Sequence, residues 1–256
     1  MNRKKIVIGN WKMNPAGGRE AETMFRRSER LLGPLRNIEA VICPPFIYLE
    51  NLKKISRKIK LGAQDAFWGD KGPFTGEVSA EMLGNLGAKY VIVGHSERRA
   101  LGESDDMVNK KLKGVLAAGL SPVVCVGELS RDNRHQYFDT VKAQIRAALA
   151  GVPKTLFHKV IVAYEPVWAI SSTKNRRDAT PKDSLEMAIY IRKVLSDMSS
   201  PPVAASVRII YGGSVTEKDA GEFLKSGGVV GLLPGRASLT PEKFAKIVKI
   251  AEDALN

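Results

Sequence analysis

Residues 163–168 place a carboxylate where a buried strand should end. The run 160–163 is apolar, and Pro166 directly follows Glu165. Because a strand interior tolerates neither an unpaired carboxylate nor a proline, Glu165 should lie at the carboxyl end of the strand and face a cavity. The next segment, 171–178, is polar and cationic, as mobile loops are. This pattern is typical of a base beneath a lid, and a solvated loop glutamate is the alternative.

Two further pairs of polar side chains directly follow apolar runs. Asn10 and Lys12 come after the first such run, and His95 and Glu97 come after the fourth. An ordinary surface lysine is the alternative for Lys12, and a satisfied structural histidine is the alternative for His95. We treat all four as candidate site residues.

The histidines and cysteines do not have the spacing of metal ligands. His135 and His158 lie in polar or helix-exit sequence and are expected at the surface. Cys43 and Cys125 lie in apolar runs and are expected to be reduced thiols. The sequence therefore predicts neither a metal site nor a disulfide framework.

Glycine-bearing turns follow the last two apolar runs. Gly212-Gly213-Ser214 comes after the seventh run, and Gly235-Arg236 comes after the eighth. Glycines let the backbone approach an anion, and a helix N-terminus supplies free N–H groups. A phosphate cradle together with a lysine, a base and an imidazole suits proton abstraction next to the carbonyl of a small phosphorylated sugar.

The elements that must position these side chains alternate along the chain. The apolar runs cover residues 6–9, 40–43, 59–64, 90–94, 121–126, 160–163, 207–211 and 228–233. Helix-like segments cover residues 19–32, 47–55, 80–86, 105–118, 138–149, 181–196, 217–224 and 241–255. A long loop at 65–79 interrupts the third unit.

This alternation predicts an α/β fold, a closed (β/α)8 barrel of eight parallel strands ringed by helices. No linker is long enough to divide the chain, so residues 1–256 are expected to form one domain. An open doubly wound sheet is the alternative; it would normally use fewer strands and a glycine-rich dinucleotide turn after the first one. In such a barrel the candidate residues meet at the carboxyl ends of the strands, with a phosphate site after strands seven and eight.

The net charge of +13 is the most prominent compositional number. The basic residues are scattered, lack interleaved aromatic residues and form no nucleic-acid motif, which favours a solvated basic surface that attracts anionic metabolites over a nucleic-acid interface. No apolar leader and no run of membrane-spanning length occurs, so we expect a cytoplasmic protein without a membrane partner.

Motifs along the whole chain resemble, in the same order, those of the triosephosphate isomerase family. They are Gly9-Asn10-Trp11-Lys12-Met13-Asn14, Cys43-Pro44-Pro45, Gly62-Ala63-Gln64-Asp65, Gly72-Pro73-Phe74-Thr75-Gly76-Glu77, Gly94-His95-Ser96-Glu97-Arg98-Arg99, residues 163–170 and Tyr211-Gly212-Gly213-Ser214-Val215. The resemblance implies a TIM barrel and a cofactor-free interconversion of dihydroxyacetone phosphate and glyceraldehyde 3-phosphate through an enediolate.

The resemblance also implies a role for each candidate. Glu165 would carry the proton between two carbons, and a neutral His95 would polarise the carbonyl. Lys12 would neutralise substrate charge, Asn10 would orient the substrate oxygens, and Glu97 would support Lys12.

Phosphate binding and assembly follow from the same resemblance. Ser171 of the lid, Ser214, Gly235 and Arg236 would bind the substrate phosphate. The loop around Thr75 would be the arm of a homodimer that inserts near the partner's site.

Two segments depart from the family pattern. Residues 171–179 replace the usual six-residue lid tip Gly-Thr-Gly-Lys-Thr-Ala with nine residues that lack glycine and include Lys174, Arg176 and Arg177. Arg236 replaces the second glycine of a pair, which is costly if that position requires a positive φ. We expect retained isomerase activity with altered lid closure and phosphate affinity, and a lid cation recruited to the phosphate.

Two other classes of function stay open at this point. One is a catalytically weakened phosphosugar-binding protein on the same barrel, with the altered lid as its cause. The other is a basic nucleic-acid or surface-binding protein. The complete set of Asn10, Lys12, His95 and Glu165 argues against the first and against a different phosphosugar enzyme on this fold.

Overall fold

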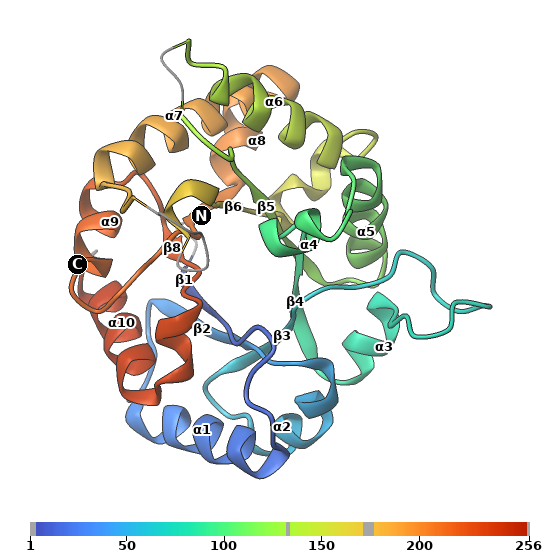
Figure 1. Cartoon of the computed structure of the whole chain (residues 1–256), viewed down its shortest axis with the longest axis vertical. Helices are drawn as coiled ribbons and strands as arrows, with labels where there is room; N and C mark the ends of the chain where they lie inside the picture. Colours follow the sequence, from blue (N-terminus) through green and yellow to red (C-terminus); the bar gives the residue numbers. More distant parts are fainter. Residues whose placement is uncertain (1–3, 132–133, 171–176, 255–256) are drawn as a thin grey trace.

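A computed structural model describes residues 4–131, 134–170 and 177–254. Within these residues, eight parallel strands form a closed barrel in the order β1 to β8, with the helices arranged around it (Figure 1). The strands are β1 Lys5–Asn10, β2 Ile38–Cys43, β3 Lys60–Ala63, β4 Ala88–Val93, β5 Ser121–Val126, β6 Ile161–Tyr164, β7 Arg208–Tyr211 and β8 Gly231–Leu232. Closure of the sheet confirms the predicted fold class and excludes the open doubly wound alternative.

Helices connect successive strands and cover the outside of the barrel. The α-helices are α1 Gly18–Leu31, α2 Leu49–Ile55, α3 Ala80–Asn85, α4 Ser96–Ala100, α5 Asp105–Ala117, α6 Tyr137–Ala148, α7 Pro181–Met198, α8 Pro201–Ser206, α9 Ala220–Ser226 and α10 Pro241–Asp253. Short 3-10 helices are η1 Phe46–Tyr48, η2 Lys154–Lys159, η3 Val167–Ala169 and η4 Arg236–Leu239. No helix in the described ranges is both long and apolar enough to cross a membrane.

Alternation along the strands creates two apolar layers. In β1, Ile6 and Ile8 belong to a cluster that fills the barrel interior, whereas Val7 packs in the larger cluster between sheet and helices, as does Trp11 just after the strand. Because both faces of each strand are buried, the strands read as continuous apolar runs instead of alternating ones. The same alternation decides which residues at the strand ends face inward.

The observed elements depart from the predicted ones at several places. The eighth strand begins at Gly231, three residues later than expected, because Gly228 adopts φ +69°, which no strand residue has. The helix expected at 217–224 begins at Ala220, after a turn in which Asp219 accepts the Thr216 N–H at 2.7 Å. Pro201 begins α8, which was not expected, because a proline at the first helical position needs no N–H partner.

The loop 65–79 projects from the barrel beside α3 (Figure 1). Within this loop, Phe67 stacks on Trp68 at a ring-centroid distance of 4.2 Å and packs at a tilt against Phe74 at 4.5 Å. At its base, Asp65 accepts hydrogen bonds from the buried Lys111 at 2.8 Å. The projection is therefore internally packed and anchored to α5.

Candidate active site

Glu165 lies immediately after β6 with its side chain inside the barrel. Ile161 and Ala163 face the interior and Tyr164 faces the helices, so the alternation of the strand directs the next residue inward. Glu165 is only 2% exposed. The predicted carboxylate at a strand end facing a cavity is therefore observed, and the solvated loop glutamate is excluded.

Two donors hold the Glu165 carboxylate. The Nε2 atom of His95 lies 3.2 Å from Oε1, and the backbone N–H of Ser96 donates to Oε2 at 3.2 Å. On the other side of the imidazole, the Glu97 N–H donates to Nδ1 at 3.1 Å. Because Nδ1 accepts, the ring proton lies on Nε2 and points at the carboxylate.

Lys12 is held from several directions. Its N–H donates to Asn10 Oδ1 at 2.9 Å, its carbonyl accepts from Gln64 Nε2 at 2.8 Å, and its Nζ lies 2.6 Å from Glu97 Oε1. Its φ of +53° is unusual for a side-chain-bearing residue and costs on the order of 1–3 kcal/mol. Such a conformation persists only where neighbouring groups fix it, as these contacts do.

One cavity of ≈ 320 Å³ brings the candidates together. Its lining includes Asn10, Lys12, His95, Glu165, Ser214, Gly235 and Arg236. Glu97 lies beside it as the partner of Lys12 and lines a smaller adjoining cavity. The predicted residues of strands one, four, six, seven and eight therefore meet at the carboxyl ends of the strands.

The glycine turns permit close approach to these side chains. A Cβ atom at Gly212 would lie 2.8 Å from Glu165 Cγ, and one at Gly235 would lie 3.3 Å from Lys12 Cε. Arg236 begins η4 and is not among the described non-glycine residues with positive φ. The family's second glycine is thus replaced without the backbone cost considered above.

Two predicted residues are not among those that line the cavity in the described part of the chain. Thr75 is exposed near the tip of the projecting loop. Ser171, with the rest of 171–176, lies outside the described residues, so its expected phosphate contact stays a prediction. His135 and His158 are exposed, as expected.

Several residues around Glu165 carry no signal of their own in the sequence. Ser96 was visible only as part of a motif, and its contact uses the backbone. Cys125 lies behind the carboxylate; burial and the Glu165 charge raise the pKa of its thiol well above the usual value. Gly127 approaches so closely that a Cβ there would lie 1.9 Å from the Glu165 carbonyl oxygen.

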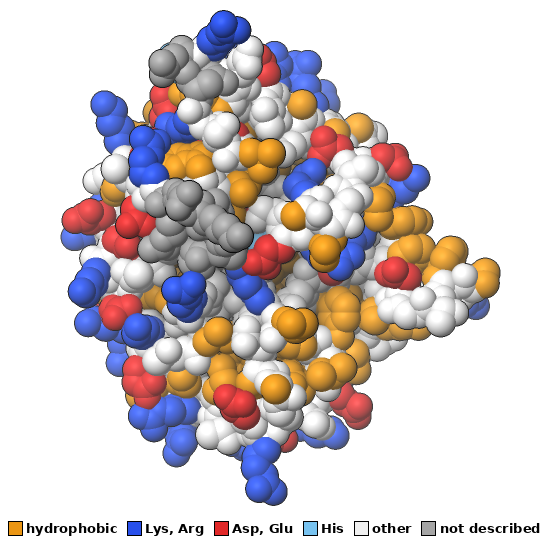
Figure 2. Space-filling view, in the orientation of Figure 1, with side chains coloured by type: hydrophobic (Ala, Val, Ile, Leu, Met, Phe, Trp, Pro, Cys, Tyr) orange, Lys and Arg blue, Asp and Glu red, His pale blue; other side chains and the backbone are white. Residues whose placement is uncertain are grey.

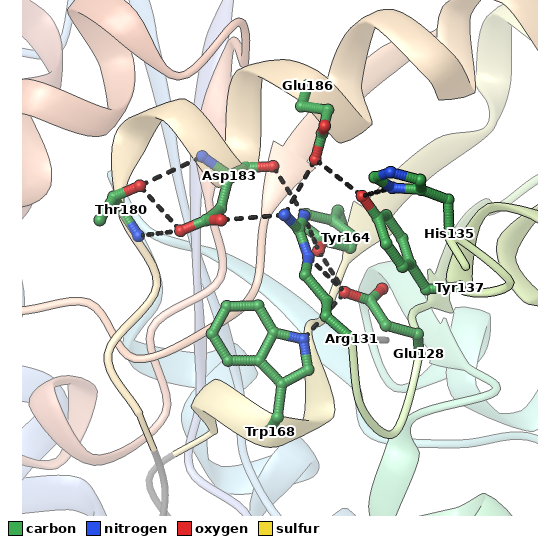
Figure 3. Close-up of polar contacts among 9 residues, drawn as sticks. All are labelled: Glu128, Arg131, His135, Tyr137, Tyr164, Trp168, Thr180, Asp183 and Glu186. Atoms are coloured by element: carbon green, nitrogen blue, oxygen red, sulfur yellow. Dashed lines mark hydrogen bonds and ion pairs between the residues drawn. The ribbon is translucent and has the colours of Figure 1, made fainter. Parts of the chain in front are cut away.

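A polar cluster on the helix side of β6 was also missed (Figure 3). It centres on Arg131 and includes Glu128, Tyr164 and Trp168. Asp183 and Glu186 of α7 complete the cluster. The members come from the loop after β5, from β6, from η3 and from α7, and no spacing along the chain indicates that these segments meet.

The arrangement supplies the parts of a proton-transfer site. A buried carboxylate can accept a proton, an imidazole Nε2–H beside it can donate to a developing oxyanion, and a lysine ammonium can stabilise negative charge. The glycine turns leave room for an anionic group at the same mouth.

Comparisons with known proteins agree with this geometry. The family model described as triosephosphate isomerase matches residues 5–251. The triosephosphate isomerase of Thermoanaerobacter pseudethanolicus is 42% identical over 252 residues, covering 96% of this chain and 99% of the relative. Those of Aquifex aeolicus and Chloroflexus aurantiacus are 40% and 43% identical, each covering 96% of this chain and 98% of the relative.

Proposed function

This chain belongs to the triosephosphate isomerase family and is an isomerase of that family, and we propose that it interconverts dihydroxyacetone phosphate and D-glyceraldehyde 3-phosphate. The observation that carries the proposal is the meeting of Glu165, His95 and Lys12 in one cavity beside two glycine turns.

The proposed reaction is a proton transfer between adjacent carbons. Glu165 removes a proton from the carbon next to the carbonyl, and His95 donates a hydrogen bond from Nε2 to the carbonyl oxygen. Lys12 stabilises the negative charge of the enediolate, and Asn10 orients the substrate oxygens. Glu165 then returns the proton to the neighbouring carbon. His95 gives its Nε2 proton to the first oxygen and takes one from the second, so both carbons and both oxygens balance without a cofactor.

The present contacts of Glu165 imply a movement during this cycle. Its Oε2 accepts the Ser96 N–H, and its Oε1 lies against His95 Nε2. A substrate carbonyl that takes the His95 hydrogen bond must therefore displace the carboxylate. We propose that Glu165 leaves Ser96 when the substrate binds and approaches the substrate carbon.

A coupled isomerase assay of Glu165→Gln tests the proposal. The variant keeps the shape of the side chain but removes the base, so kcat should fall by roughly 10²- to 10⁴-fold while KM changes little. Glu22→Gln, on the exposed face of α1, is the matched control and should retain wild-type turnover. Near-normal turnover in Glu165→Gln would overturn the mechanism.

The lid is proposed to bind phosphate differently from that of its relatives. Its sequence supports this: residues 171–179 lack glycine, are three residues longer than the usual tip, and contain Lys174 and Arg176. Weaker inhibition by inorganic phosphate in Lys174→Ala or Arg176→Ala would support a recruited cation, and unchanged inhibition in both would exclude it.

The second candidate is a phosphosugar-binding protein with weak turnover. The divergent lid favours it, because a lid that closes poorly would weaken catalysis. Substrate binding in the wild-type protein without turnover in the same assay would favour it.

A homodimer is also proposed. Met13, Ile47, Phe74 and Met82 are large apolar side chains left exposed on or near the projecting loop. Figure 2 shows apolar side chains gathered on this loop and on the adjacent side of the molecule. A groove of ≈ 440 Å³ at the base of the loop is lined by Met13 and Ile47 among others. We propose that it receives the loop tip around Thr75 from a second copy.

A further inference from the structure

The cluster around Arg131 joins the loop after β5 to the N-terminus of α7 (Figure 3). Arg131 Nε donates to Glu128 Oε1 at 3.2 Å, and Nη1 donates to Asp183 Oδ1 and to Glu186 Oε2, each at 2.9 Å. The guanidinium also lies 4.8 Å from the ring of Tyr137 at the start of α6. One side chain thus connects three carboxylates from two segments.

Glu128 connects this guanidinium to the segment that carries the base. Its Oε1 accepts from the Tyr164 hydroxyl and from Trp168 Nε1, both at 2.8 Å. Its backbone carbonyl accepts the Val167 N–H at 3.0 Å. Residues immediately before and shortly after Glu165 are therefore attached to one carboxylate.

The Glu128 carboxylate is buried, with 1% of the residue exposed. In the part of the chain that the structure describes, Arg131 is the one cation paired with it. A buried carboxylate that loses its counter-ion is strongly destabilised and tends to rearrange. Arg131 Nη2 in addition donates to the Tyr164 hydroxyl at 3.2 Å, so the cation contacts the base-bearing strand directly.

The far side of the guanidinium is fixed by α7. Asp183 forms a capping box with Thr180, accepting the Thr180 N–H at 2.8 Å. Burial alone would raise the pKa of Asp183, but the Thr180 hydrogen bonds and the charges of Arg131 and Arg177 outweigh burial and lower it. The carboxylate therefore stays charged near neutral pH and holds the arginine in one orientation.

We propose that Arg131 is a positioning residue for Glu165: it holds Glu128 in place, and Glu128 fixes the backbone on both sides of the base through Tyr164 and Trp168. The inference rests on the proposed function of Glu165. A planar guanidinium with five donors can serve Glu128, Asp183 and Glu186 at once, which a lysine cannot.

Arg131→Met tests the inference, and Arg208→Met is its matched control. Arg208 is also a mostly buried arginine, ion-paired with Glu39 at 3.1 Å and 5.8 Å from the ring of Tyr90, but it lies at the opposite end of the barrel. Both variants should lose stability. Only Arg131→Met should lose kcat per folded molecule, by roughly 10- to 100-fold, because a displacement of about 1 Å at the base has that effect.

The pattern of kinetic constants separates positioning from general damage. Inhibition by inorganic phosphate should stay within about twofold of wild type in Arg131→Met, because Arg131 does not line the cavity. If Arg131→Met folds poorly, Glu186→Gln removes the most exposed partner and should lower kcat in the same direction, by a smaller factor. The effects of Glu128→Gln and Arg131→Met on kcat should be non-additive, because they act through the same contact.

The possible failures are distinguishable. If the wild type turns over and Arg131→Met matches Arg208→Met in kcat, the positioning role is wrong and the proposed function stands. If kcat and phosphate inhibition weaken together in Arg131→Met, the effect is general damage to the site, and the positioning role is also wrong. A wild type without turnover overturns the proposed function itself.

Discussion

At the scale of single residues, the position of the base depends on a missing side chain. Gly212 occupies an inward-facing position just after β7, beside Glu165, and its N–H donates to the Tyr164 carbonyl at 2.8 Å. A methyl group there would come within 2.8 Å of Glu165 Cγ, which is closer than carbon atoms pack. The carboxylate would have to move.

Gly212→Ala should therefore lower kcat by roughly 10- to 100-fold with little loss of stability. Gly221→Ala is the control, because its added Cβ meets only Ile250 at an ordinary 3.4 Å and lies within α9. That variant should keep its turnover and gain up to ~1 kcal/mol in the free energy of unfolding. The measurement is the isomerase turnover of both variants at equal concentrations of folded protein. Equal turnover in the two variants would contradict the close approach of Gly212 to Glu165.

Individual site residues differ in how far the sequence reveals them. Glu165 and Lys12 stand out because a charged side chain at the end of an apolar run is anomalous. Arg131 carries no such signal, because it lies in a polar loop and its carboxylate partners lie from three to 55 positions away. The left-handed backbone of Lys12 is equally hidden, because only the contacts of Asn10 and Gln64 impose it.

At the scale of elements, the two ends of the barrel have different tasks. At the amino end, Glu39 of β2 contacts three other strands: it accepts from Tyr90 of β4 at 2.6 Å, from Arg208 of β7 at 3.1 Å and from Lys60 of β3. At the carboxyl end, the polar side chains face the cavity. Stability and chemistry are thus separated along the barrel axis.

The Glu39 cluster should make stability depend on pH. Burial alone would raise the pKa of Glu39, but hydrogen bonds from Lys60 and Tyr90 outweigh it and hold that pKa below its ordinary value. A carboxyl group whose pKa is lowered by folding stabilises the protein at pH values above its pKa in the unfolded chain, about 4.3. This stabilisation is lost as the pH falls through the pKa of the folded state. Glu39→Gln should cost about 3 kcal/mol in the free energy of unfolding at pH 7.

The difference in the free energy of unfolding between wild type and Glu39→Gln should shrink below about pH 4, as wild-type Glu39 takes up its proton.

At the alkaline limit, burial and the Glu39 hydrogen bond raise the pKa of Tyr90 to about 12. A raised phenol pKa contributes stability below about pH 10 that is lost as the pH rises towards 12. Urea unfolding across this range is the measurement; a difference that stays constant between pH 7 and pH 3 would contradict the assignment.

The boundaries of elements were less predictable than their existence. Apolar runs revealed all eight strands, because burial on both faces requires such composition. They did not reveal that β8 has only two residues, because composition specifies neither the left-handed backbone of Gly228 before it nor the point at which pairing ends. A proline pair likewise reads as a break, although in α8 it begins a helix.

At the scale of the whole molecule, the projecting loop connects the proposed dimer interface to the site. Gln64 precedes the loop and donates to the carbonyls of Lys12 and Cys43, both at 2.8 Å. A partner seated against this loop would therefore support the strained backbone of Lys12. Monomers should be poor catalysts even though every catalytic side chain belongs to one chain.

Ile47→Asp should separate the proposed dimer, because Ile47 is 77% exposed and lines the groove that would receive the partner's loop. Ile189→Asp is the control, because Ile189 is 61% exposed on α7, away from that groove. In analytical ultracentrifugation the wild type and the control should sediment as dimers and Ile47→Asp as a monomer with reduced kcat. A monomeric wild type would refute the homodimer.

The two-residue strand β8 also has a consequence for the motions of the barrel. It shares one residue pair with β7 and two with β1, so the ring of strands is closed by its shortest member. Thermal fluctuations that open the ring should begin at this seam, because the single residue pair between β7 and β8 is the shortest strand pairing among the described residues. The turns that begin at Gly212 and Gly235 border the seam on either side. An anion bound between these turns would therefore reduce the fluctuations that open the ring of strands.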